Sequence, residues 1–290
     1  DELVRDLPGI LRYFREESGI PHWVGTVGLG ICGRGQEYHE DPAISVMAGS
    51  FPEGSFRIFG TVNDSFTDFL REHRGWIKNT ESHFGIVHGA PRNQRIPELI
   101  TSLAAAANDG FLVGGLTSSR GAYSQVAENL TEGGISGVLF SPEVVVATNL
   151  TQSCAPFGDK HQITDCEQNI IITLDGRPAL DVFIEEIGEV LARDLNQAVR
   201  DIAAALPVQG SDTGDYLVRN VVGVDPRHRL LAIGEQLTLG RLIQFCRRDP
   251  ENARKDMRRM LRDLKGRLPG PPRGGVYYSC VGRGRNMFGE

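Results

Sequence analysis

The 290-residue chain lacks the features that mark several classes of protein. No apolar run approaches the roughly 18 residues that a membrane-spanning helix needs, and the N-terminal residues show neither the basic segment nor the apolar core of a secretory signal. The absence of any C-x-x-C or H-x-x-x-H pattern argues against a metal site. No G-x-S-x-G sequence or catalytic set of recognisable spacing is present, so nothing in the chain argues for an enzyme.

Net charge and cysteine content indicate which partners and which cellular compartment to expect. The net charge is −6 and the isoelectric point is about 5.7, whereas a nucleic-acid-binding protein of this size is usually basic. We therefore expect neither nucleic acid nor a membrane as a partner. The cysteines are odd in number and widely scattered, at Cys32, Cys154, Cys166, Cys246 and Cys280. This pattern is typical of free thiols in a reducing compartment and predicts a cytoplasmic location.

Glycine is the residue in excess. There are 35 glycines, about 12% of the chain against an average near 7%. They follow no G-X-Y period and lie among apolar runs, which excludes a collagen-like fibre and a flexible polar tract. Because only glycine adopts positive φ at little steric cost, they indicate many short strands joined by sharp corners.

Hydrophobic periodicity predicts an α+β fold. Helices are expected at residues 6–17, 63–73, 96–108, 179–205 and from Asp249 onward, where Asp249 is the N-cap and Pro250 the first helical residue. Strands are expected at residues 22–31, 42–47, 55–59, 83–88, 111–113, 137–140, 144–148, 170–174, 216–222, 230–233 and 274–280. Grouped strands with helices between them favour two lobes of mixed or antiparallel sheets covered by helices, of which a layered α/β/β/α arrangement is one form. The boundary is expected near residue 176 or in the loop 207–214.

Gly28, Gly30 and Gly33 form a G-x-G-x-x-G sequence after an expected strand. A dinucleotide-binding sequence of this kind opens a helix that receives the pyrophosphate, but here a polar loop and a second expected strand follow. A kinase glycine loop is followed by a V-A-I-K lysine, which is missing. We interpret the three glycines as a tight corner between strands.

Two stretches, residues 30–35 and 279–284, resemble each other. Each places a cysteine at an expected strand end, followed by glycines around one arginine, Arg34 in the first and Arg283 in the second. Glycines expose backbone N–H groups and arginine offers a planar fork to a carboxylate or phosphate, so each stretch is a candidate anion-binding loop. The alternative is a glycine turn with a surface arginine, which the residues alone favour.

Residues 247–267 concentrate positive charge. They hold nine Lys or Arg and four Asp or Glu, which leaves the rest of the chain about eleven units negative. Such a helix is able to contact nucleic acid or an acidic partner. The alternative, which we favour from sequence, is a solvated face with i,i+4 pairs such as Glu251 with Lys255.

Five groups of residues carry a resemblance to a known family through their order and spacing. They are residues 28–35 with 42–46; 111–115 with 133–138; 154–158 with 163–164 and 174–180; 218–220 with 223–225, 240–245 and 248–249; and 280–284 with 287–289. Together they resemble the FIST family (F-box and intracellular signal transduction proteins), over nearly the whole chain. The resemblance implies a FIST N domain at residues 1–176 and a FIST C domain at residues 177–290.

The family pattern differs from this chain in three places. Members have a strand before the position of Asp6, continue past the position of Glu290 into a Gly-Glu-Ile segment and a final strand, and usually have glycine where Ser153 stands. The expected C-terminal domain is therefore incomplete. Beyond these differences, the resemblance implies a cytoplasmic, non-enzymatic sensory module. Such a module binds a small ligand, an amino acid or another small anion, and relays a signal to a partner such as a histidine kinase or a cyclic-dinucleotide enzyme.

We expect the ligand site at the strand-end glycine loops. The expected anion ligands are Arg283 and Arg34, with Arg219 as a weaker candidate. The expected wall and backbone positions are Cys280, Cys154, Gly282, Gly284, Gly114 and Gly115.

Three alternatives stay open at this stage. Some family members bind haem and sense nitric oxide, for which the axial candidates are His22, His39, His88, His161, His228 and Cys246. A thiol-dependent enzyme would use Cys280 beside Arg283. A scaffold would bind no small ligand at all.

Overall fold

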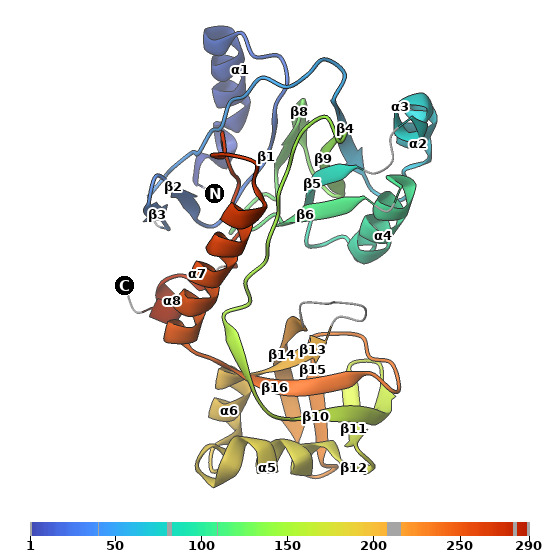
Figure 1. Cartoon of the computed structure of the whole chain (residues 1–290), viewed down its shortest axis with the longest axis vertical. Helices are drawn as coiled ribbons and strands as arrows, with labels where there is room; N and C mark the ends of the chain where they lie inside the picture. Colours follow the sequence, from blue (N-terminus) through green and yellow to red (C-terminus); the bar gives the residue numbers. More distant parts are fainter. Residues whose placement is uncertain are drawn as a thin grey trace. The chain divides into compact units, whose positions relative to one another are not determined.

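A computed structural model describes residues 2–39, 41–79, 83–108, 110–207, 216–280 and 283–288 (Figure 1). The chain forms two compact units, Asp1–Ala147 with Pro272–Val281, and Thr148–Pro271 with Gly282–Glu290. Each unit combines helices with sheets, which confirms the two-lobed α+β class. The expected domain boundary at 176/177 falls between two strands of the second unit and stays a prediction; most of the alternative boundary loop lies outside the described residues.

The first unit is built around a four-stranded sheet of order β4-β9-β5-β6. Its strands are β4 (Phe56–Val62), β5 (Phe84–Gly89), β6 (Phe111–Leu116) and β9 (Ile135–Phe140). β5 and β6 run parallel, and α4 (Ile96–Ala106) lies between them in the chain; the other pairs are antiparallel. The other helices are η1 (Glu2–Arg5), α1 (Leu7–Ser18), α2 (Thr67–Glu72) and α3 (Arg74–Lys78).

Two smaller sheets complete the strands of this unit. One has the order β1-β7-β8, formed by Val24–Thr26, Gln125–Ala127 and Asn129–Thr131. The other is the hairpin of β2 (Ile31–Gly33) and β3 (Gln36–Tyr38). The core packs the apolar stripe of α4, Ile96, Leu99 and Leu103, against aromatic and aliphatic side chains of α2, β4 and β9.

The second unit is a sheet that closes on itself. Its order is β10-β16-β13-β14-β15-β11, β10 also pairs with β11, and β12 extends β11. The strands are β10 (Cys154–Glu167), β11 (Ile170–Leu174), β12 (Arg177–Pro178), β13 (Ile202–Pro207), β14 (Tyr216–Asp225), β15 (Leu230–Ile233) and β16 (Leu242–Arg248). The helices are α5 (Ala179–Ala192), α6 (Leu195–Asp201), α7 (Pro250–Arg267) and α8 (Arg285–Phe288). The fully buried Phe183 of α5 meets Phe245 of β16 edge to face, with ring centroids 5.1 Å apart.

The expected long helix over residues 179–205 is two helices, α5 and α6, and it is wrong over residues 202–205, which form a strand. Gly188, at φ 75°, interrupts α5, and Asp194 begins α6 by accepting a hydrogen bond from the Gln197 N–H. The Ala-rich residues that follow form β13, buried between β14 and β16. An apolar run buried on both faces shows no alternation, so the pattern did not separate this strand from a helix.

Three expected strands are also wrong. Residues 42–47, 144–148 and 274–280 form no ladder, and β9 pairs with β4 and β5. Two strands that the sequence analysis missed, β10 and β16, form the most extensive pairing of the second unit. Gly114 and Gly115, expected just beyond a strand, lie within β6.

The G-x-G-x-x-G sequence is a tight corner, as predicted. Gly33 pairs with Gln36 across a two-residue turn in which Arg34 and Gly35 have φ of 53° and 78°. Of these two residues, only Gly35 adopts a positive φ at little steric cost. Arg34 is one of the few non-glycine residues of the described chain with positive φ.

In the part of the chain that is described, no helix combines the length and the apolar character required to cross a membrane.

Candidate functional site

A cluster of two thiols and an arginine lies on one face of the closed sheet. In the antiparallel pair β10–β16, Cys154 lies directly opposite Arg248, and Cys246 lies two residues before Arg248. Alternate residues of a strand share a face, so all three side chains point to the same side of the sheet. Cys154 and Cys246 are buried there against Ala203 and Ala205 of β13, outside the main core.

Arg283 is held beside this cluster by the segment that precedes Cys154. Its Nη1 donates to the carbonyl oxygen of Thr151 at 3.0 Å, and its Nη2 donates to the Thr151 hydroxyl at 2.8 Å. The hydroxyl in turn donates to the Asp256 carboxylate of α7 at 2.5 Å, which also accepts from the Gln152 N–H at 2.9 Å. Arg283 is thereby fixed near Cys154, and it forms no ion pair with a carboxylate of the described residues.

The two arginines and the Cys246 thiol lower the pKa of the Cys154 thiol. A hydrogen bond with the Cys246 thiol, then the charge and hydrogen bond of Arg248 and the charge of Arg283, lower the pKa of Cys154, although burial opposes the shift. The same bond, burial and the charge of Cys154 raise the pKa of Cys246. Of the two thiols, Cys154 is therefore the one that ionises first.

Two further groups border the cluster. The Tyr216 hydroxyl donates to the Cys154 carbonyl oxygen at 2.7 Å, and burial, followed by the charge of Asp256, raises the pKa of Tyr216 to about 12. Burial alone would raise the pKa of Asp256, but hydrogen bonds from Thr151 and Arg259 lower it overall. Tyr216 therefore stays a neutral donor at physiological pH and Asp256 stays a carboxylate.

Ser153 occupies the position where the family pattern has glycine. Its φ is 44°, in the left-handed region that glycine adopts most easily, which gives a physical reason for the usual glycine. The buried Ser153 Oγ has no hydrogen-bond partner among the described residues. An unsatisfied buried hydroxyl next to Cys154 is available to a ligand.

This arrangement is suited to a small anion. No carboxylate of the described residues forms an ion pair with Arg248 or Arg283; Arg248 donates to the Asn220 side-chain oxygen at 2.5 Å instead. Guanidinium groups without a carboxylate partner offer charge-assisted hydrogen bonds to a carboxylate or phosphate. We define Cys154, Arg248 and Arg283, with Ser153 and Cys246, as the arginine–thiol cluster.

The structure brings together only some of the predicted site residues. Cys154 and Arg283 meet in this cluster, and Gly284 follows Arg283, its carbonyl accepting from the Met287 N–H at the start of α8. Arg219 is engaged elsewhere, in an ion pair with Glu235. The predicted positions in the first unit are Arg34, Gly114, Gly115 and the exposed Cys280, and Gly282 lies outside the described residues.

Three members of the cluster were not among the predicted anion-site residues: Ser153, Arg248 and Cys246, the last of which was named only as a haem candidate. Arg248 and Cys246 lie in β16, which was not predicted as a strand. Had that strand been recognised, the spacing Cys246-x-Arg248 would have placed both side chains on one face. Their proximity to Cys154 depends on the β10–β16 register, which the sequence does not show.

The haem candidates have varied surroundings. His22, His39, His161 and His228 each bond a carboxylate, while Cys246 is in the cluster. His88 is 3% exposed, its Nε2 lies 2.9 Å from the Tyr278 hydroxyl, and its Nδ1 is buried without a partner. An axial ligand must present one ring nitrogen to open space, and His88 does not. Among the described residues no three His, Cys, Asp or Glu side chains gather as metal ligands.

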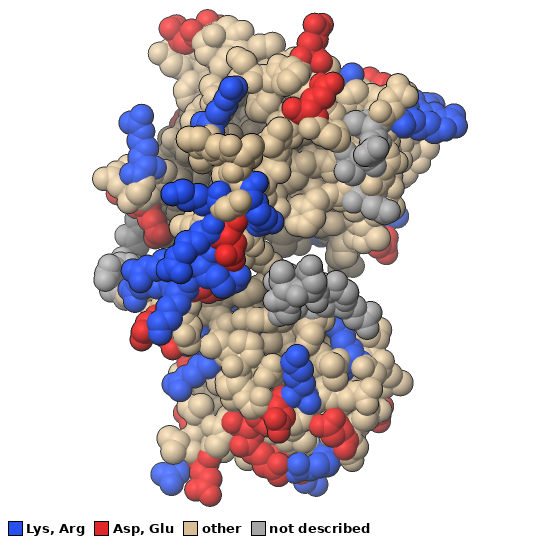
Figure 2. All heavy atoms as spheres, viewed as in Figure 1, with Lys and Arg blue, Asp and Glu red and all other residues tan. Residues whose placement is uncertain are grey.

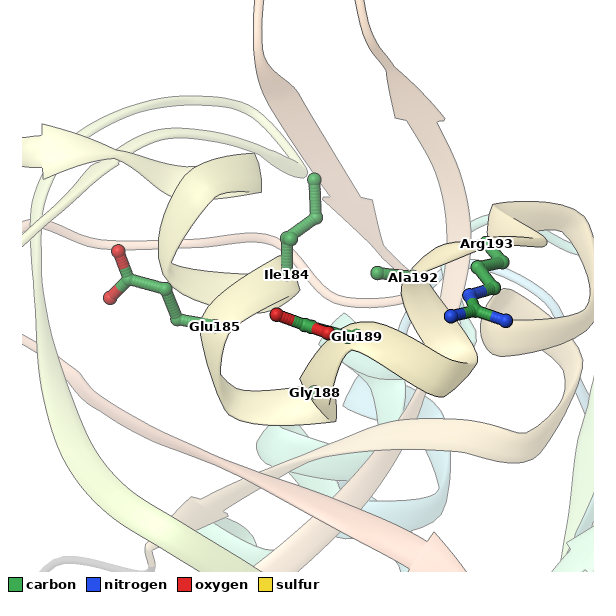
Figure 3. Close-up of a pocket in the computed structure, with 6 residues that line it drawn as sticks. All are labelled: Ile184, Glu185, Gly188, Glu189, Ala192 and Arg193. Carbon is green, nitrogen blue, oxygen red and sulfur yellow. The ribbon is translucent and has the colours of Figure 1, made fainter.

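A hollow of about 440 Å³ lies elsewhere in the second unit, where Gly188 interrupts α5 (Figure 3). It is lined by Ile184, Glu185, Gly188, Glu189, Ala192 and Arg193. All of these residues belong to α5 or follow it directly, so the hollow is formed by a single bent helix. It contains none of the predicted site residues.

The reactivity of Cys154, compared with that of Cys32 in the first unit, tests the effect of the arginines on the Cys154 thiol. We expect alkylation of Cys154 by iodoacetamide to rise at lower pH than that of Cys32, because burial, followed by Glu37, raises the pKa of Cys32. Mass spectrometry of the two cysteine peptides, sampled across pH, gives both midpoints. Arg248→Gln should raise the midpoint of Cys154 and leave that of Cys32 unchanged; an unmoved Cys154 midpoint would contradict the cluster.

Comparisons with known proteins show which family the chain belongs to. The FIST N domain model matches residues 2–177 and the FIST C domain model matches residues 179–290. The uncharacterized protein Rv0628c of Mycobacterium tuberculosis is 29% identical over 276 residues, 92% of this chain and 71% of that protein. The uncharacterized protein Mb0898c of Mycobacterium bovis is 28% identical over 289 residues, with 93% and 71% coverage. No solved structure matches the chain. With both domain models matched along its length, the chain belongs to the FIST family of sensory domains in signal transduction.

Proposed function

We propose that this chain binds a small anion at the arginine–thiol cluster and passes the binding event to a partner protein. The observation that carries the proposal is that Arg248 lies opposite Cys154 and Arg283 is held on Thr151 of the preceding segment, while no carboxylate of the described residues forms an ion pair with either arginine. A carboxylate such as that of an amino acid is the ligand class that two guanidinium forks suit. The family is sensory and is not known as enzymatic, and we propose no catalytic step.

The proposed relay uses contacts around Arg283. The bonds from Arg283 to Thr151, and from Thr151 to Asp256, connect the cluster to α7. Farther along the same segment, the Phe288 ring packs under Arg254 of α7, 4.9 Å from the guanidinium carbon. An anion that draws Arg283 toward Cys154 would change the balance of these contacts. The anion favours one arrangement of these contacts over another only if its affinity for the two arrangements differs.

A thermal-shift screen tests the proposed binding. The probes are individual amino acids, acetate and inorganic phosphate, added to the full chain. A compound present at roughly 100 times its Kd should stabilise the unit that binds it by about 2.7 kcal/mol. Arg283→Gln and Arg248→Gln should each remove most of the rise in melting temperature.

Arg34→Gln is the matched control for this screen. Arg34 was predicted as a second anion ligand, but it lies in the β2–β3 turn of the first unit, whereas the residues of the cluster belong to the second unit. Its variant should respond to the probes like the wild type. No response to any probe, or an equal response in all three variants, would reject the site and favour a scaffold without ligand.

A further inference from the structure

Helix α7 has three distinct faces. Ala253, Met257, Met260 and Leu264 recur at helical spacing; Ala253 and Met260 are buried, and the other two are half-buried. Because this stripe supplies the buried side chains of α7, the remaining surface of the helix is not required for burial.

A second face of α7 is occupied by ion pairs. Arg259 bonds Asp256 at 2.7 Å and Asp263 at 3.1 Å, and Lys255 bonds Glu251 at 2.8 Å. Asp249 caps the helix by accepting from the N–H groups of Glu251 and Asn252. All the acidic residues of residues 249–267 are thus engaged within the helix or at its cap.

The third face is basic and is left without acidic partners. Its members are exposed and follow one another at spacings of three or four residues, which places them on one side of the helix: Arg254, Arg258, Leu261, Arg262 and Lys265. We call this face the basic stripe. No carboxylate of the described residues forms an ion pair with any of its four cations. Figure 2 shows Lys and Arg gathered where Figure 1 places α7.

The stripe is unfavourable for the isolated helix. Arg254, Arg258 and Arg262 stand at successive i,i+4 positions, and like charges at this spacing destabilise a helix. The helix dipole favours cations only in the last turn, which accounts for Lys265 and not for the arginines. A solvated face selected for stability would alternate charge, as the Arg259 face does.

We propose that the basic stripe is the docking surface for an acidic, amphipathic helix of a partner protein. Arginines one helical turn apart match carboxylates at the same spacing, and each guanidinium is able to bind a carboxylate through two hydrogen bonds. Leu261 is 53% exposed in the middle of the stripe and supplies an apolar anchor. The proposal rests on the proposed function, because it names the chemistry of the partner to which the signal passes.

An acidic helix fits these observations better than nucleic acid or a lipid surface. The residues outside 247–267 carry about eleven negative charges, which would repel a long phosphate backbone. The ion-paired face with Asp256 and Asp263 also adjoins the stripe. A membrane surface would require more apolar side chains than the single Leu261.

Peptide binding tests the stripe in the full chain. The probe is a fluorescent synthetic helix with glutamates at i, i+4 and i+8 and one leucine on the same face. Its controls are a scrambled peptide of identical composition and a mixed-sequence DNA duplex. Anisotropy titrations should show that the patterned helix binds more tightly than either control, and that the affinity falls as salt is raised.

Arg258→Gln with Arg262→Gln is the decisive double variant, because glutamine keeps helix propensity close to that of arginine. We expect it to weaken binding of the patterned peptide about tenfold or more. Arg227→Gln, which removes an exposed arginine from the turn between β14 and β15, should leave the affinity unchanged. No binding, equal binding of the scrambled peptide or the duplex, or an unaffected double variant would each overturn the docking surface.

The two proposals fail separately. The anion screen reads the melting temperature and depends on Arg248 and Arg283, whereas the peptide titration depends on Arg258 and Arg262. Peptide binding without any anion response would retain the stripe and reject the anion site; the reverse result would reject the stripe alone.

Discussion

The Gly114→Ala variant is expected to lose about 3 kcal/mol or more of the stability of the first unit. Gly114 has a φ of 144°, a backbone conformation that residues with an L side chain rarely adopt. A Cβ added there would lie 1.8 Å from the carbonyl oxygen of Val87 in the neighbouring strand. Neither the backbone conformation nor the paired strand is able to adjust cheaply. Urea unfolding followed by tryptophan fluorescence measures the effect, since Trp23 and Trp76 both lie in this unit.

Gly115→Ala is the matched control. A Cβ at Gly115 would meet only the Tyr278 ring, at 3.9 Å, which is an ordinary contact. It should change stability by less than about 1 kcal/mol. Equal losses in the two variants would contradict the β5–β6 packing, whereas the expected difference would identify Gly114 as a glycine required by the strand pair.

Acid should destabilise the first unit through His88. Burial lowers the pKa of His88 from 6.5 to about 4, because the folded state disfavours the charged imidazole. Between these two pH values the unfolded state binds the proton and the folded state does not. Stability is therefore fully present above pH 6.5 and is lost as pH falls toward 4, by about 3 kcal/mol for a shift of this size.

Urea unfolding at a series of pH values, again followed by tryptophan fluorescence, measures this slope. His88→Gln should reduce the slope between pH 6.5 and 4. Burial also lowers the pKa of His83, so a smaller slope of the same sign should persist in the variant. A slope unchanged by His88→Gln would show that another group is responsible.

The fold was predictable where one face of an element is apolar and the other polar. The stripe of α4 and the Asp249 cap of α7 gave helices whose start the sequence marks clearly. Prediction failed at β13, whose Ala-rich residues are buried on both faces, and for residues 274–280, which form no strand. Strand pairing between distant segments is a property of the whole chain, and local pattern does not encode it.

The candidate site was predictable only in part for the same reason. Cys154 and Arg283 stood in stretches that resemble the family, and the structure brings them together. Arg248 joins them because β16 pairs with β10 in one particular register, and a shift of one residue would have turned its side chain to the opposite face. Arg34 and Arg283 looked equivalent in sequence, but the first lies in a hairpin turn and the second bonds the chain next to Cys154.

The first unit is formed by two segments of the chain that are separated by most of the second unit, and this arrangement has a consequence for biosynthesis. The first unit contains Pro272–Val281, so the Tyr278 that bonds His88 is translated 190 residues later. At ordinary elongation rates, the ribosome takes on the order of ten seconds to make the intervening second unit. During that interval His88 and the β5–β6 edge are exposed without their final cover. The nascent first unit is therefore completed only after residues 148–271 of the second unit have been made, and a chaperone is able to act on it during that interval.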